Sequence, residues 1–249
     1  LGDVLTSGHV ASCREVIGDM SLLRFLRGAK NQLTRAIELF RTHLDMREKY
    51  KWHEIRERVM SSRSFDPLHF TVDDMIHGSF IKTHWKMNLC AGYTESGDPL
   101  AIVVVPMSDT WIDIMAKQMK CGEIELISNV LEFYYELFVR RQLQLDLLSR
   151  RQGKMVCMET VWDFAGGINN SYWKSFARSN YRKLHLAHNM ITGCCPNIQG
   201  RIHFMRTSWW MRWSCRCLWW ITDALLRRKM VLYSGSDSEN YRRLCCKIG

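Results

Sequence analysis

The feature that most constrains the fold is a change of pattern near residue 80. Before it, apolar residues recur at helical spacing, most clearly Leu33, Ala36 and Phe40. After it, short runs rich in β-branched residues, such as Leu100 to Val105, alternate with longer helical segments. Strands that alternate with helices build a largely parallel sheet with helices packed on it. The sequence therefore predicts an α/β fold preceded by a small helical part.

This pattern divides the chain into three parts. Residues 1–60 form a predicted helical subdomain, with one helix closed by Gly28 and a second capped by Asn31. Residues 61–80, which include Pro67 and Gly78, are expected to form a linker with one turn of helix. Residues 81–249 form the main domain. We expect strands at 81–90, 100–105, 154–164, 201–206 and 229–233, and helices at 108–121, 123–150, 171–190 and 209–226.

Composition limits the classes of partner. The formal net charge of +10 favours an anionic partner or serves solubility alone, and ten tryptophans with fourteen methionines favour an adaptable apolar cavity or a lipid-facing surface. We find no run of apolar residues long enough to span a membrane and no signal peptide in Leu1 to Val10. The ten cysteines are irregularly spaced, which predicts free thiols in a reducing compartment.

Five stretches carry a family resemblance in the same order and spacing. They are DMSLLRFLRGAK from Asp19, GDPL from Gly97, VWDFAG from Val161, CPNIQGRIHF from Cys195 and RKMVLYSGS from Arg228. Together they resemble the CRAL-TRIO lipid-binding family across residues 19–237. The resemblance implies a mixed, largely parallel sheet floor, a helical gate over an apolar pocket, and one bound hydrophobic ligand. Because the family usually continues with a further helix and strand, the C-terminus is expected to be truncated or divergent.

The resemblance also implies headgroup residues. In family members that bind phosphoinositides, two lysines and a glutamate surround the phosphate, and the matching positions are Lys30, Lys229 and Asn197. A buried phosphate needs fixed cationic donors, but the asparagine removes one charge and its ion pair with Lys229. Thr160 matches a hydroxyl that meets choline headgroups in some members. Two plain surface lysines and a plain β-forming threonine are the alternatives.

The segment from Trp209 to Leu226 matches the mobile gate of the family and has the composition of an interfacial helix. Its apolar face carries Trp210, Trp213 and Trp220, while its polar stripe combines aromatic and cationic side chains. The stripe and its edge consist of Trp209, Arg212, Arg216, Trp219 and Asp223. We expect this helix to close over the ligand and to contact anionic membranes. The alternative is that the tryptophans pack against the helical subdomain.

Enzyme signatures are weak. Cys195 and Arg201 fit the C-x5-R spacing of cysteine phosphatases, but a helix precedes this loop and a strand follows it, the reverse of that site. His185 and His188 lack a third metal ligand, and Asp163 reads better as a turn or capping residue than as a catalytic carboxylate.

We therefore expect a monomeric, cytoplasmic protein, peripheral at membranes, that transfers or presents a phospholipid such as phosphatidylinositol and is not an enzyme. We expect no cofactor, metal or nucleic-acid partner. The alternative is a lipid-sensing module of a signalling or GTPase-regulating protein that does not transfer lipid.

Overall fold

The computed structural model describes residues 13–63, 65–84, 86–104, 120, 122–164, 196, 198–207, 212–213, 229–233 and 237–248. The chain divides into two compact units. A helical unit comprises Leu1–Phe70, Leu131–Cys157 and His185–Gln199, and a sheet unit comprises Thr71–Val130, Met158–Leu184 and Gly200–Gly249. The predicted domain boundaries at residues 60 and 80 stay a prediction.

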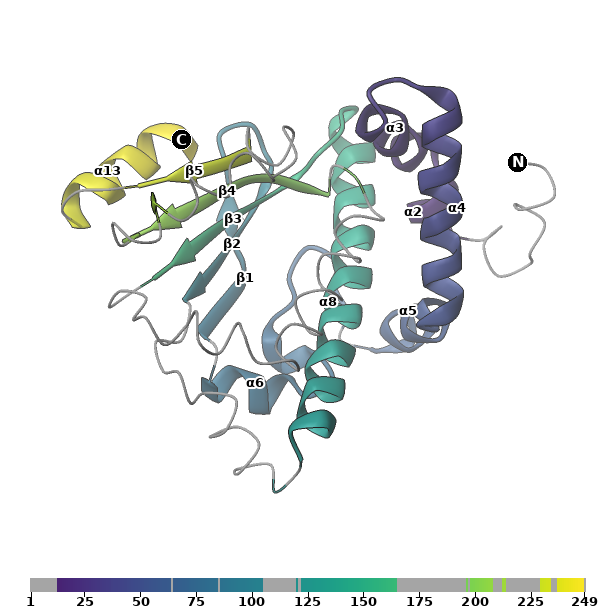
Figure 1. Ribbon diagram of the computed structural model, residues 1–249, viewed down its shortest axis with the longest axis horizontal. Coiled ribbons are helices and arrows are strands. Elements are labelled where there is room, and N and C mark those ends of the chain that lie inside the picture. Colours follow the sequence, from purple (N-terminus) through teal and green to yellow (C-terminus); the bar gives the residue numbers. More distant parts are fainter. Residues whose placement is uncertain are drawn as a thin grey trace. The chain divides into compact units, whose positions relative to one another are not determined.

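The helical unit contains four helices from the start of the described chain and most of one long helix (Figure 1). These are α2 (Arg14–Ile17), α3 (Asp19–Gly28), α4 (Leu33–Lys49), α5 (Trp52–Ser61) and, from Leu131 onward, α8 (Glu123–Gln152). Their apolar residues meet at helical spacing, with Phe25 and Phe40 edge to face at a ring-centroid distance of 5.1 Å. The predicted helices at 19–28 and 123–150 are thus confirmed within two residues.

The turn between α3 and α4 differs from the sequence expectation. Asn31 does not cap α4, because Lys30 and Asn31 both adopt left-handed backbone conformations, with φ values of 55° and 64°. Gln32 is the N-cap residue and makes no side-chain capping bond. Two successive left-handed residues reverse the direction of the chain within a few positions. An N-cap residue typically has an extended backbone, so Asn31 cannot reverse the chain and cap α4 at the same time.

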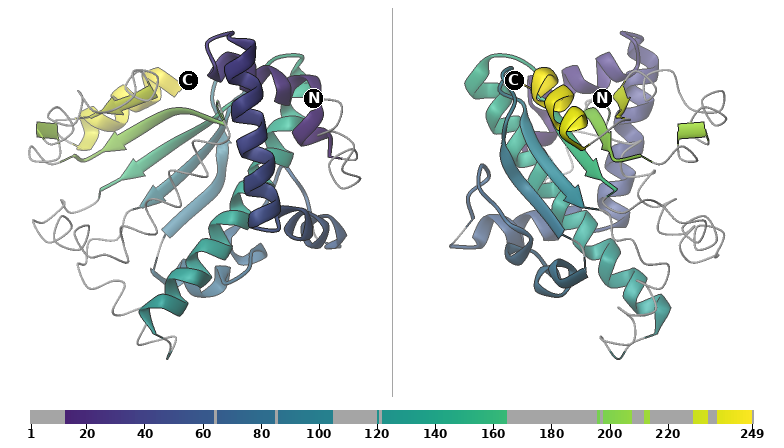
Figure 2. Two further views of the ribbon diagram at one scale, coloured as in Figure 1. Left: turned by 45° about the vertical axis from the view of Figure 1, so that its right-hand side comes forward. Right: turned by 90° about the vertical axis from the view of Figure 1, so that its left-hand side faces the viewer.

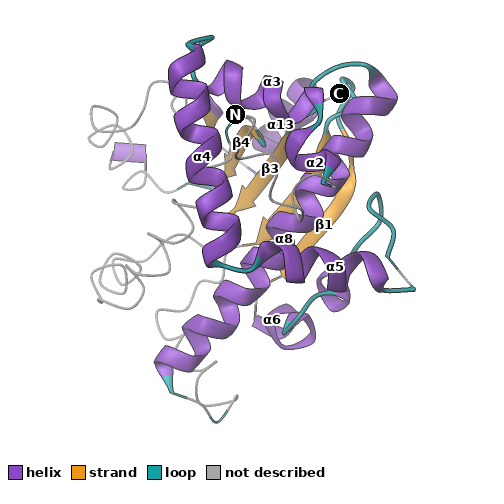
Figure 3. Ribbon diagram, turned by 90° about the vertical axis from the view of Figure 1, so that its right-hand side faces the viewer, coloured by secondary structure: helices purple, strands orange, loops and turns teal. Residues whose placement is uncertain are grey.

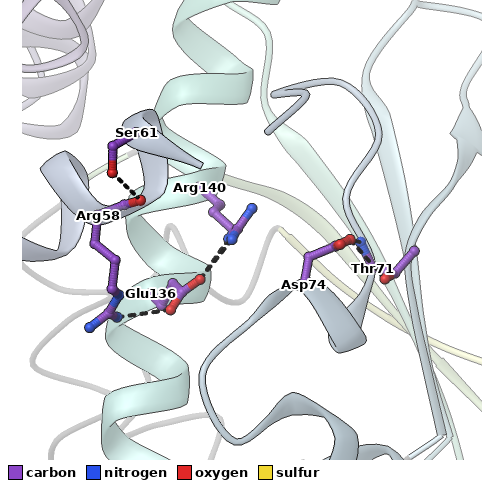
Figure 4. Close-up of polar contacts among 6 residues, drawn as sticks. All are labelled: Arg58, Ser61, Thr71, Asp74, Glu136 and Arg140. Atoms are coloured by element: carbon purple, nitrogen blue, oxygen red, sulfur yellow. Dashed lines mark hydrogen bonds and ion pairs between the residues drawn. The ribbon is translucent and has the colours of Figure 1, made fainter. Parts of the chain in front are cut away.

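The long helix α8 supplies buried polar partners to the helical unit. Arg58 and Arg140 both bond to the buried carboxylate of Glu136, at 2.9 Å each (Figure 4). Two residues after Glu136, Phe138 packs against the ring of Trp52 at 5.0 Å between centroids. Pairing the carboxylate with two guanidinium groups offsets the cost of removing its charge from water.

The sheet unit has five strands in chain order (Figure 1). Its described elements are η1 (Val72–Asp74), α6 (Gly78–His84), β1 (Lys86–Tyr93), β2 (Pro99–Val104), β3 (Met158–Asp163), β4 (Gln199–Met205), β5 (Met230–Leu232) and α13 (Asp237–Ile248). Strands β1 and β2 are antiparallel, whereas the pairs β2–β3 and β4–β5 are parallel. Figure 3 shows the strands as one layer. This confirms the predicted mixed, largely parallel α/β fold.

One predicted strand is wrong in its first half. Residues 81–84 belong to α6, and the strand begins only at Lys86. The Thr83 hydroxyl donates to the Phe80 carbonyl at 2.6 Å, a contact typical of a helix. The prediction failed because Ile81 and Thr83 are β-branched residues, which favour strands. The turn predicted at Gly97 is present, with Gly97 at a φ of 79° and its amide bonded to the Thr94 carbonyl. The helices predicted at 108–121, 171–190 and 209–226 lie outside the described residues, except for Lys120 and Arg212–Trp213.

The C-terminal helix α13 covers one face of the sheet (Figure 2). Leu244 packs with Val161, Met205 and Tyr233, which come from or directly follow three different strands. Ile248 packs at the edge of the same cluster. Sequence reasoning did not predict this helix.

Candidate functional site

The two faces of the sheet differ in burial, most clearly along β4. His203 and Met205 are 0% exposed, whereas Ile202 and Phe204, which alternate with them, are half-buried. Because successive side chains of a strand point to opposite faces, one side of β4 is closed and the other is partly open. At β2 this contrast is absent, since Val103 is 9% exposed and Ile102 is half-buried. The closed side, which we call the covered face, consists of Glu159, Val161, His203, Met205 and Tyr233 under α13. The other, the half-buried face, consists of Trp162, Ile202, Phe204, Met230 and Leu232 with Thr160.

The half-buried face is apolar and aromatic. The Phe204 ring lies 6.4 Å from that of Trp162 and stacks on Phe164 at 5.9 Å with an interplanar angle of 15°. Strand pairing places Leu232 beside Phe204, so the partly exposed surface extends to β5. Toward β2 it gives way to Thr160 and Ala101, which are buried. Partly exposed rings and aliphatic side chains in a row are what a hydrophobic ligand needs, since covering them removes apolar surface from water.

Thr160, the predicted headgroup hydroxyl, lies on this face and is buried, with 5% of its surface exposed. It therefore stands on the apolar floor itself. The predicted role of its hydroxyl in binding a headgroup stays a prediction.

The covered face holds a buried polar chain across three strands. The His203 imidazole joins the Glu159 carboxylate, at 2.8 Å from Nε2, to the Tyr233 hydroxyl, at 2.9 Å from Nδ1. Burial raises the pKa of Tyr233 to about 12, and the nearby charge of Glu159 adds to the shift. The Lys247 ammonium lies over the Tyr233 ring, 5.6 Å from its centroid. Every member has a partner, so this chain ties strands together on the side away from the half-buried face.

Asp163 ends β3 and is paired. Both of its carboxylate oxygens accept from the Arg206 guanidinium, at 2.6 and 2.5 Å. This fork-to-fork geometry fixes the ends of β3 and β4 against each other. A structural ion pair thus accounts for the carboxylate that the sequence left open as a turn residue or an acid.

Within the helical unit, the turn that carries Lys30 packs against Pro196, the residue before Asn197. A Cβ atom added to Gly28 would lie 2.2 Å from the Cβ of Pro196, so only glycine allows this approach. Lys30 itself is exposed. The structure thus brings together the two segments that carry the predicted headgroup residues Lys30 and Asn197, although Asn197 lies outside the described residues.

The same unit contains a pocket next to Pro196 whose lining is half polar. It is lined by Glu15, Met20, Ser21, Arg24, Phe25, Gln142, Leu145, Asp146, Pro196 and Ile198. Arg24 is fixed there, because it donates to the Val156 carbonyl at 2.5 Å and to the Ser149 hydroxyl at 3.0 Å. The buried carboxylate of Glu15 is held by Arg56 at 2.6 Å. Such a lining suits water or small polar groups and not an acyl chain.

The other predicted site residues are placed only in part. Lys229 is half-buried directly before β5 and belongs to the sheet unit, so its meeting with Lys30 of the helical unit stays a prediction. Of the gate residues, Trp213 is 54% exposed and Arg212 is half-buried. Outside the described residues lie Trp209, Trp210, Arg216, Trp219 and Trp220.

The remaining chemistry is sparse. Arg201 is an exposed residue within β4 and not part of a loop before a helix, which disfavours the phosphatase reading with Cys195. Cys195, His185 and His188 lie outside the described residues. Among the described residues, no three His, Cys, Asp or Glu side chains gather closely enough to hold a metal ion. No helix of the described chain has the length and apolarity needed to cross a membrane.

The mixed sheet with its helices defines a CRAL-TRIO-like fold. A solved structure with this arrangement is that of Sfh5 from yeast, at a TM-score of 0.55 and 12% sequence identity. The match covers 88% of this chain and 65% of the Sfh5 chain, so the present chain spans about two thirds of that structure. No protein-family model and no curated protein sequence matches the chain.

Proposed function

We propose that this protein binds one hydrophobic lipid molecule against the half-buried face of its sheet. The observation that carries the proposal is the alternation along β4, where Ile202 and Phe204 stay half-buried while His203 and Met205 are closed off. With Trp162 and Leu232 beside them, these side chains form a continuous apolar floor. The CRAL-TRIO-like fold supports the same conclusion independently of any single residue.

A phospholipid is the proposed ligand class. A headgroup phosphate would be met by Lys30 and Lys229, with Asn197 and Thr160 donating to hydroxyl or ester oxygens. The packing of Gly28 against Pro196 supports half of this arrangement, because Lys30 follows Gly28 by two residues and Asn197 directly follows Pro196. Replacing the family's glutamate by Asn197 leaves phosphatidylinositol as one candidate among phospholipids.

The biological role follows from where such a ligand must go. We propose a cytoplasmic, monomeric protein that contacts anionic membranes transiently through the segment around Trp209–Trp220 and exchanges its lipid there. The exposed ring of Trp213 supports this. The alternative is a lipid-sensing module that retains its ligand. An assay of labelled-lipid exchange between two vesicle populations distinguishes these two roles, since only a protein that releases its lipid at membranes accelerates the exchange.

The ligand itself is tested by native mass spectrometry of the full chain purified from cells. We expect one lipid per chain. In Ile202→Glu the bound lipid should fall to a small fraction, because a carboxylate on the apolar floor would have to be buried beneath an acyl chain. Lys86→Glu is the matched control, since it places the same group at an exposed position of β1 and should retain the lipid.

Two results would contradict the proposal. One is a chain that carries no lipid from cells and takes up none from mixed phospholipid vesicles. The other is an Ile202→Glu variant that retains as much lipid as Lys86→Glu. A lipid of unchanged amount but altered headgroup in Lys229→Ala would support the predicted headgroup role and leave the apolar floor intact.

A further inference from the structure

The turn between α3 and α4 exposes a leucine among cations. Leu33 is 66% exposed, the highest fraction among the large apolar side chains of the described residues. Arg27, Lys30 and Arg35 surround it in sequence and are all exposed. Between Asp19 and Glu38 the chain has no acidic residue. We call Arg27, Lys30, Leu33 and Arg35 the basic tip.

The side chains of the basic tip are free to meet a partner. None of its three cations forms an ion pair with a residue in the described part of the chain. Side chains in the first turn of a helix lean toward its N-terminus, so Leu33 and Arg35 of α4 lean toward the turn that carries Lys30. The tip therefore gathers one apolar and several positive groups at one end of the helical unit.

The turn beneath these side chains is held in place. The Asn31 amide donates to the Leu26 carbonyl at 2.8 Å, and the Gln32 amide donates to the Ala29 carbonyl at 3.1 Å. Gly28 packs directly on Pro196. A prearranged backbone lowers the entropy cost of docking, so a few exposed side chains suffice for weak binding.

We propose that the basic tip docks on an anionic phospholipid bilayer, with Leu33 inserted below the headgroups and the three cations at phosphate level. A bilayer is the partner that offers both a negative surface and hydrocarbon at this spacing. A nucleic acid would satisfy the charges but would leave Leu33 in water. Lys30 is the only tip residue that the proposed lipid site also uses. Arg27, Leu33 and Arg35 have no part in that site, so variants of these three test docking independently of lipid carriage.

Vesicle co-sedimentation of the full chain tests the proposal. We expect binding to phosphatidylcholine vesicles to require added phosphatidylserine and to weaken with salt. The double variant Arg27→Gln/Arg35→Gln should bind about thirty-fold more weakly at low ionic strength, since two cations are lost. Leu33→Ser should bind about tenfold more weakly through lost insertion.

The matched control is Arg41→Gln/Arg63→Gln, which removes the same charge from two other exposed positions of the helical unit and should bind within about twofold of the parent chain. All the variants change exposed side chains, so thermal unfolding and co-purified lipid should stay unchanged.

Three outcomes overturn the proposal. The first is vesicle binding that does not depend on phosphatidylserine, and the second is a control variant that loses as much vesicle binding as Arg27→Gln/Arg35→Gln. The third is a Leu33→Ser variant that binds vesicles normally, while Arg27→Gln/Arg35→Gln loses heparin binding as strongly as vesicle binding. The last would assign the tip to soluble polyanions. Loss of carried lipid in Ile202→Glu with normal vesicle binding would separate the two functions.

Discussion

The covered and half-buried faces of the sheet belong to the same strands and yet have opposite character. On the covered face, His203 and Met205 are fully buried beneath α13, and the polar groups form a closed chain of partners. On the half-buried face, the neighbouring Ile202 and Phe204 keep apolar surface in contact with solvent. A protein that only needed stability would gain by closing both faces, since each large apolar side chain fully buried adds about 2 kcal/mol. The difference supports the proposal that one face holds the fold together and the other receives the ligand.

The largest expected effect breaks the covered face. Met205→Ala should lower the free energy of unfolding by about 3 kcal/mol, because Met205 is fully buried and its removal leaves a cavity under α13. Urea unfolding followed by circular dichroism measures the change. Lipid content per folded chain should stay unchanged.

Phe204→Ala is the matched variant one residue earlier. Its cost in unfolding free energy should be less than half as large, since part of the ring already faces solvent, while its lipid content should fall several-fold. If Phe204→Ala proved the more destabilising change and left lipid content intact, the assignment of the two faces would be reversed.

The contrast between the faces also marks what sequence patterns reveal. Alternation of strands and helices predicted the mixed sheet and the long helix α8, because hydrophobic periodicity reports local structure. It placed Thr160 in β3 but could not say which face was open, since that depends on the docking of α13. The Glu159–His203–Tyr233 chain joins residues that lie 44 and 30 positions apart in the sequence, and no local pattern encodes such contacts.

Two further features escaped the sequence reading for physical reasons. Arg24 sits within an apolar run and reads as one of the polar residues of an exposed helix stripe, but it is buried and bonded to the Val156 carbonyl. Asn31 is a residue type that is preferred at N-cap positions. In the structure, however, Gly28 packs on Pro196, and the turn that follows makes Gln32 the N-cap residue of α4. Packing decided both cases over local propensity.

The second prediction weakens the covered face without making a cavity. Glu159→Gln keeps the shape of the side chain but removes the charge that His203 meets at 2.8 Å, so unfolding free energy should fall by about 2 kcal/mol. Glu95→Gln, at an exposed position of the same unit, serves as control and should change little. Equal stabilities of the two variants in urea would show that the buried contact contributes nothing.

A third prediction extends the comparison to a histidine of the other unit. Burial, together with the nearby charge of Arg47, lowers the pKa of His43 from 6.5 to about 3. At a pH between these two pKa values, His43 is protonated in the unfolded chain but neutral in the folded chain. The free energy of unfolding therefore falls as the pH drops below 6.5 toward 3. Between pH about 6.5 and about 5.5 the loss should be about 1 kcal/mol. In His43→Gln this contribution should vanish, and an unchanged slope in urea titrations at the two pH values would refute the assignment to His43.

The smallest expected effect concerns the far end of the buried chain. Tyr233→Phe removes one neutral hydrogen bond to His203, so its cost should be about 1 kcal/mol at neutral pH, while Tyr241→Phe on the exposed side of α13 should cost nothing measurable.

The pKa of Tyr233 is raised to about 12, which means that the folded chain keeps the phenol proton after the unfolded chain has lost it. Stability should therefore fall as the pH rises from 10 toward 12, and Tyr233→Phe should reduce that alkaline loss. Because Glu159 contributes to the raised pKa, Glu159→Gln should bring the ionisation of Tyr233 to lower pH, a shift that ultraviolet absorbance of the phenolate measures directly. An ionisation unaffected by Glu159→Gln would mean that burial alone sets the pKa of Tyr233, and that the covered face is held by packing and not by its polar chain.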